Sequence, residues 1–128
     1  MNRSELAGHI ETIEKSYEFF LAYAAQGAAG DAESRVGGQL RDYLKATDEA
    51  LRALHDGIGT LAAEEGLEGH GAYADIAEVV AEDAARAGAA VRVVLAQPSI
   101  GAQMIDNLNA STHLRAVLTD LFLLDDVV

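Results

Sequence analysis

Residues 40–61 read LRDYLKATDEALRALHDGIGTL, and their spacing decides the fold. Apolar side chains, with one threonine among them, recur there at alternating steps of four and three residues. They are Leu40, Leu44, Thr47, Leu51, Leu54, Ile58 and Leu61. This spacing places all of them along one side of an α-helix. The stretch therefore predicts an amphipathic helix that buries one stripe against its neighbours.

Three further segments have the same kind of spacing. The first of them carries Leu6, Ile10, Ile13, Tyr17, Leu21 and Ala24, and the others run over residues 73–94 and 100–121. Glycine clusters and the single proline, Pro98, separate the segments, because glycine favours turns and proline ends helices. No segment alternates with a period of two, so strands are not expected.

The spacing therefore predicts an all-α fold, a single-domain four-helix bundle that is mostly up-and-down and antiparallel. The expected helices span residues 4–26, 36–65, 72–97 and 99–125. Similar helix lengths and short connections favour antiparallel neighbours in such a bundle.

The composition excludes several classes of protein. The chain has 128 residues, with 9 Lys and Arg against 21 Asp and Glu and a formal net charge of −12. It has no cysteine, which excludes disulfides, thiolate chemistry and Cys-ligated metal centres. Its acidity argues against nucleic acid and anionic membranes as partners. No uncharged apolar run reaches the roughly 20 residues of a membrane helix, and no secretory leader is evident, so we expect a cytoplasmic protein.

Apolar groups outside the main stripes predict contact with another chain. Residues 87–96 are apolar nearly all round, and leucine and valine pairs extend the apolar surface over the last six residues. A helix that is apolar on all sides is normally buried on all sides, so we expect a homodimer. Aromatic side chains would anchor its interface, and small residues would let helices approach closely. The predicted interface residues are Phe19, Phe20, Tyr23, Gly88, Ala89, Ala90 and Val93.

Polar residues of the fourth segment are candidates for a ligand pocket. Asn107 and Ser111 fall within the apolar stripe, and Arg115 lies at its edge one turn later. Buried polar groups need partners, and carboxylates at stripe edges, Glu14, Asp48 and Asp83, are the candidates. Two interpretations stay open. The layer either fixes the register of the helices, or it lines a pocket for a small polar or anionic ligand that Arg115 anchors.

A basic strip on the second segment also has two interpretations. Arg41, Lys45 and Arg52 share one helix face, with Asp48 among them and His55 nearby. The strip is either a solvated face with local ion pairs or a docking surface for an acidic partner.

No motif for catalysis, metal or a cofactor is present. A di-metal site in a four-helix bundle requires Glu-x-x-His on two helices, which this sequence lacks. Asp106, His113 and Asp120 share one face of the fourth segment, but successive members are roughly 10 Å apart along the axis, too far to chelate one ion. We therefore predict no metal, no cofactor and no catalytic residues.

The sequence predicts a non-enzymatic accessory or regulatory protein that self-associates and binds a protein partner. The alternative is a bundle, ferritin-like in shape only, that binds a small ligand or a metal at a polar core site, with or without catalytic activity. A third hypothesis is an acidic mimic that occupies a nucleic-acid-binding surface of a basic protein.

Overall fold

The computed structural model describes all 128 residues, with the exception of the side chain of His70. Helix makes up 82% of the chain, and no strand occurs among the residues described, so the predicted all-α class is confirmed. Two 3-10 turns and the short helix α3 fill the connections. The helices are α1 (Arg3–Gln26), α2 (Gly37–Gly57), α3 (Leu61–Glu64), α4 (His70–Leu95), α5 (Ala102–Ala110) and α6 (His113–Val127).

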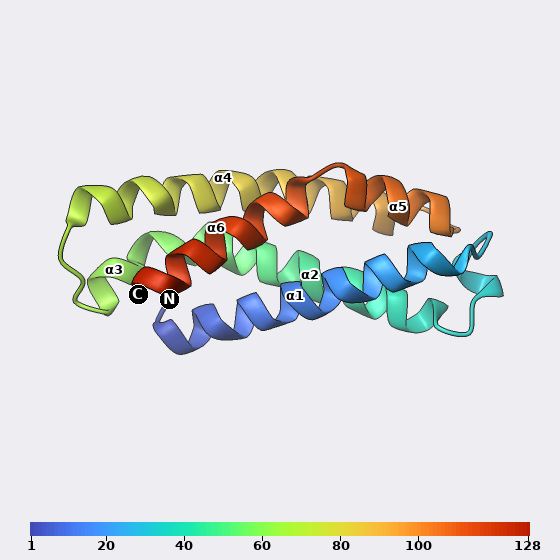
Figure 1. Ribbon diagram of the computed structural model, residues 1–128, viewed down its shortest axis with the longest axis horizontal. Coiled ribbons are helices and arrows are strands. Elements are labelled where there is room, and N and C mark those ends of the chain that lie inside the picture. The colour runs from blue at the N-terminus through green and yellow to red at the C-terminus, as the bar shows by residue number, and fades with distance from the viewer.

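The long helices lie side by side along the long axis of the molecule (Figure 1). Helix α2 packs against α1 and α4, while α6 packs against α4 and α1, and α5 packs mainly against α1. The core runs between these helices and consists mainly of leucine, isoleucine and valine side chains. All seven positions of the stripe over residues 40–61 are buried, as predicted.

In α1 the buried side shifts by one residue halfway along the helix. The buried residues are Leu6, Ile10, Ile13, Ser16, Phe20 and Tyr23. Leu21, expected in the core, is 48% exposed. The shift buries two aromatic rings, which remove more apolar area from water than Leu21 and Ala24 would. The Tyr23 hydroxyl keeps a partner, because it donates to the backbone carbonyl of Ile100 at 2.7 Å.

The fourth predicted helix, over residues 99–125, is two helices in the structure. Helices α5 and α6 meet at Ser111 and Thr112, and Thr112 has a φ of 68°. This left-handed conformation cannot continue an α-helix and is uncommon for a residue other than glycine. The second predicted helix is also shorter than expected. It gives way at Gly57 to a 3-10 turn and α3, since glycine weakens a helix interior.

Arg41, a member of the predicted basic strip, joins two loops at one end of the fold. Its Nε lies 2.6 Å from Asp31, and its Nη2 donates to the backbone carbonyl of Gln97 at 3.0 Å. Asp31 also accepts the backbone N–H of Ile100 at 2.8 Å. The hydrogen bond from Arg41 lowers the pKa of Asp31. Arg41 is therefore occupied within the chain and is not free for an acidic partner.

Candidate functional site

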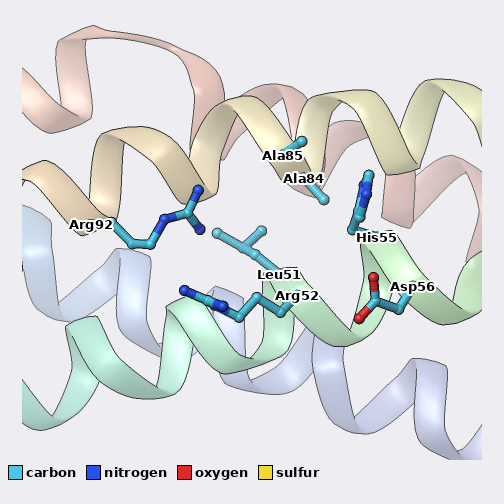
Figure 2. Close-up of a pocket in the computed structure, with 7 residues that line it drawn as sticks. All are labelled: Leu51, Arg52, His55, Asp56, Ala84, Ala85 and Arg92. Atoms are coloured by element: carbon cyan, nitrogen blue, oxygen red, sulfur yellow. The ribbon is translucent and has the colours of Figure 1, made fainter.

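A charged groove of about 400 Å³ lies between α2 and α4 (Figure 2). Leu51 and Ala84 are the buried residues of its lining, and Ala84 and Ala85 give it width because their side chains are small. Arg52 and Arg92 lie at one end, and His55 and Asp56 at the other. The residues that line the groove are Leu51, Arg52, His55, Asp56, Ala84, Ala85 and Arg92.

Asp48 holds the two arginines of this groove next to each other. Its Oδ2 lies 3.2 Å from Nε of Arg52, and its Oδ1 lies 3.0 Å from Nη1 of Arg92. The Asp48 side chain is only 16% exposed, whereas those of Arg52 and Arg92 are 61% and 43% exposed. One carboxylate thus binds two guanidinium groups, which leaves this end of the groove with one positive charge in excess.

Gly88 makes room for the contact between Arg92 and Asp48. It is buried in α4, and a Cβ atom added to it would lie 2.8 Å from Nη1 of Arg92. Any larger residue at this position would push the guanidinium group of Arg92 away. The predicted role of Gly88 was close packing between chains, but the structure places it beside a side chain of its own helix.

His55, at the opposite end of the groove, has one ring nitrogen in use. Nδ1 lies 3.0 Å from the backbone carbonyl of Ala81. A carbonyl oxygen only accepts hydrogen bonds, so Nδ1 carries the hydrogen, and Nε2 is the nitrogen left for another group.

An apolar groove of about 350 Å³ lies at the far end of the molecule, between the start of α4 and the end of α6. Leu123 and Val127 are 58% and 52% exposed, although both are large apolar residues. The Tyr73 hydroxyl joins the two helices by donating to the backbone carbonyl of Val127 at 2.8 Å. The lining residues are Gly69, Ala72, Tyr73, Ile76, Leu123, Leu124 and Val127.

Two exposed aspartates lie beside this apolar groove. Exposed Asp75 and Asp126 each lie one helical turn beyond a lining residue, on the same side of their helices. The sequence has no Lys or Arg over residues 53–85 and none over residues 116–128. One guanidinium group, that of Arg3, reaches this end of the molecule, where it donates to the carbonyl of the last residue. The groove is therefore an apolar surface with an acidic rim.

A pair of carboxyl groups connects α4 to α6. Asp83 and Asp120 interact with each other, and Oδ2 of Asp120 is buried without a hydrogen-bond partner among the described residues. Burial, together with the carboxyl group of Asp83, raises the pKa of Asp120 to about 7. Arg86 donates to Asp83 at 3.1 Å. This pair lies outside the linings of both grooves.

The structure does not bring the three predicted pocket residues to a common cavity. Asn107 and Arg115 are exposed, and the hydroxyl of half-buried Ser111 donates to the Leu108 carbonyl at 2.6 Å. Asn109 is buried in place of Asn107, and its amide has no hydrogen-bond partner among the residues described. The expectation that Asn107 faces the core is wrong, because α5 ends early and its buried side differs from that of a continuous helix.

The predicted interface residues divide into buried and accessible ones. Phe20 and Tyr23 are buried within the chain, which leaves them no surface for a partner. Phe19 is half-buried and stacks on the ring of Tyr43, with centroids 4.6 Å apart. Ala90 is also half-buried. Ala89 and Val93 are exposed, and Val93 at 60% is the most exposed of the large apolar residues.

The described side chains contain no group of three or more His, Asp or Glu residues placed to hold a metal ion. Within the same part of the chain, no helix has the length and apolar character needed to cross a bilayer. Comparison with known protein families, curated proteins and solved structures found no match. The grooves and charges of this chain are therefore the features that bear on its function.

Sequence reasoning identified part of each groove. It placed Arg52, Asp48 and His55 together on one helix face, but not Arg92, which belongs to another helix and joins them only through packing. It also singled out the apolar residues near the end of the chain. It did not associate them with Tyr73 and Ile76, which lie about 50 residues earlier in the sequence. No local sequence pattern predicts such contacts between helices.

Proposed function

We propose that the protein is a non-enzymatic accessory or regulatory protein that binds a protein partner. The partner contributes a basic amphipathic helix, which lies in the apolar groove between α4 and α6. The observation that supports this proposal is the exposed apolar groove with its acidic rim. Amphipathic helices commonly bind in this way, with apolar anchors in a groove and complementary charges at its edges.

The charge of the chain favours a basic partner over a second copy at this groove. A second copy also carries a formal charge of −12, so two acidic rims would face each other. Like charges placed opposite each other weaken an interface. A helix with Lys or Arg on both sides of its apolar stripe would instead pair with carboxylates such as Asp75 and Asp126.

Two synthetic helical peptides test the proposal. One has a leucine stripe flanked by lysine, and its matched control has the same stripe flanked by glutamate. We expect fluorescence anisotropy to detect saturable binding of the lysine peptide and none of the glutamate peptide. Equal binding of the two peptides, or none of either, would contradict the proposal.

Two substitutions locate the binding surface. Leu123→Asp introduces a charge into the apolar groove, and we expect it to weaken binding of the lysine peptide by at least about tenfold. Leu21→Asp places the same charge on α1, at a leucine that is also about half exposed. It should leave the affinity unchanged. If both variants weaken binding equally, the added charge and not the groove is responsible.

We also propose that α5 and α6 together form the fourth member of an up-and-down, antiparallel four-helix bundle. The directions of the ribbons in Figure 1 support this arrangement. Self-association remains part of the proposal, with exposed Ala89 and Val93 on α4 as its contact surface. We expect the protein to act in the cytoplasm.

A further inference from the structure

We propose that the groove between α2 and α4 binds a small organic anion, whose carboxylate or phosphate group is held by Arg52 and Arg92. This groove shares no lining residue with the apolar groove of the proposed function. Anion binding at this groove can therefore be tested independently of partner binding at the apolar groove.

The arrangement of the arginines supports this site. Asp48 accepts from one nitrogen of each guanidinium group, Nε of Arg52 and Nη1 of Arg92. A guanidinium group has five N–H donors, so most donors of both groups remain for a ligand. Asp48 fixes the two groups side by side before any ligand arrives, which lowers the entropic cost of binding. Two positive charges and one negative charge favour an incoming anion.

The wall formed by α4 leaves space for the ligand. Ala84 and Ala85 occupy this wall, and only small side chains there leave the groove open. Glycine in a helix interior costs about 1 kcal/mol relative to alanine. Gly88 offsets this cost by allowing Arg92 to reach Asp48. The volume of about 400 Å³ is within the range of small-molecule sites.

The opposite end of the groove limits the ligand to one anionic group. Asp56 would repel a second anionic group, whereas it can accept a hydrogen bond from a hydroxyl or ammonium group. His55 presents Nε2 because Nδ1 already donates to Ala81. The ligand class is therefore a small molecule with one carboxylate or phosphate head and a hydroxyl or amino group at its other end.

The head group can be tested by NMR with three probes: inorganic phosphate, acetate and chloride at equal ionic strength. We expect phosphate or acetate to shift the Nε–Hε signals of Arg52 and Arg92 in a saturable way, and chloride to have no such effect. The more tightly bound of the two probes identifies the head group. Equal, non-saturating shifts at all arginines, or no shift with any probe, would overturn the proposal.

Two arginines of α4 provide a matched pair of variants. Arg92→Gln should weaken binding of the effective probe by about tenfold, since it removes a charged hydrogen-bond donor. Arg86→Gln changes an arginine that is 60% exposed and pairs with Glu82 and Asp83 outside the groove. It should leave binding unchanged. Equal affinities for the two variants would overturn the proposal.

Gly88→Ala gives a test that retains every charge. The added methyl group displaces the Arg92 guanidinium group, so we expect weaker binding of the same probe while the helical circular dichroism signal is retained. Unchanged binding by a folded Gly88→Ala protein would show that the position of Arg92 is irrelevant, and it would overturn the proposal.

Discussion

The carboxyl groups of Asp83 on α4 and Asp120 on α6 interact across the contact between two packed helices. Two ionised carboxylates in this position would repel each other, so one of them keeps its proton to a higher pH. Arg86 donates to Asp83, whereas Oδ2 of Asp120 is buried without a hydrogen-bond partner among the described residues, so Asp120 is the group that keeps its proton. This pair gives the contact between α4 and α6 a dependence on pH.

The first prediction concerns stability against pH. The pKa of Asp120 is about 7 in the folded protein, whereas the ordinary value of an aspartate is 3.8. Between these values the folded state binds more protons than the unfolded state, so the free energy of unfolding falls as pH rises. The slope is at most about 1.4 kcal/mol per pH unit for one group, and it disappears above about pH 7. Urea unfolding over this pH range measures it.

Asp120→Asn is the control for this prediction. The amide is neutral at every pH, so it does not repel Asp83. We expect the variant to lose the slope and to be more stable than the natural protein above pH 7. If the two stability curves remain parallel, Asp120 is not the group responsible.

The second prediction concerns the break between α5 and α6. Thr112 has a φ of 68°, a conformation that glycine adopts more easily. Thr112→Gly should therefore raise the free energy of unfolding by about 1 kcal/mol. Thr119→Gly, inside α6, should lower it by about 0.3–0.5 kcal/mol, because glycine weakens a helix interior more than threonine does. Thermal unfolding of both variants measures whether each substitution raises or lowers the free energy of unfolding. Destabilisation by Thr112→Gly would contradict the left-handed conformation.

The third prediction concerns self-association. We expect native mass spectrometry to find a dimer, and Val93→Asp to convert it to a monomer with unchanged helicity, because the substitution charges the proposed contact surface. Leu21→Asp, on α1, should leave the dimer intact. A monomeric natural protein, or a Val93→Asp dimer, would exclude this surface.

Most of the fold was predictable, because each long helix has one strongly apolar side. The stripe from Leu40 to Leu61 is buried throughout, as its spacing indicates. The shift in α1 was not predictable in this way, since two adjacent stripes compete and packing selects the aromatic one. No glycine or proline lies near Thr112 to indicate the break between α5 and α6. Left-handed backbone at a threonine results from tertiary packing, which local propensities do not contain.

The candidate sites were less predictable than the fold. Arg52 and His55 share a helix face and were visible together, whereas Arg92 joins them only through the packing of α4 on α2. Asp120 was visible as a member of a polar face, but its partner Asp83 lies 37 positions earlier in the sequence. Such pairs depend on the rotation of each helix about its axis, which a one-residue shift alters.

The clamp formed by Asp31 and Arg41 has a consequence for local opening. It connects the loop after α1 to the loop after α4, and the N–H of Ala102 adds a further link by donating to the Ala28 carbonyl at 2.8 Å. Neither loop can leave without breaking bonds to the other. Their amide hydrogens should therefore exchange with solvent deuterium as one cooperative unit, with a common free energy of opening, in contrast to the independent fraying of ordinary surface loops.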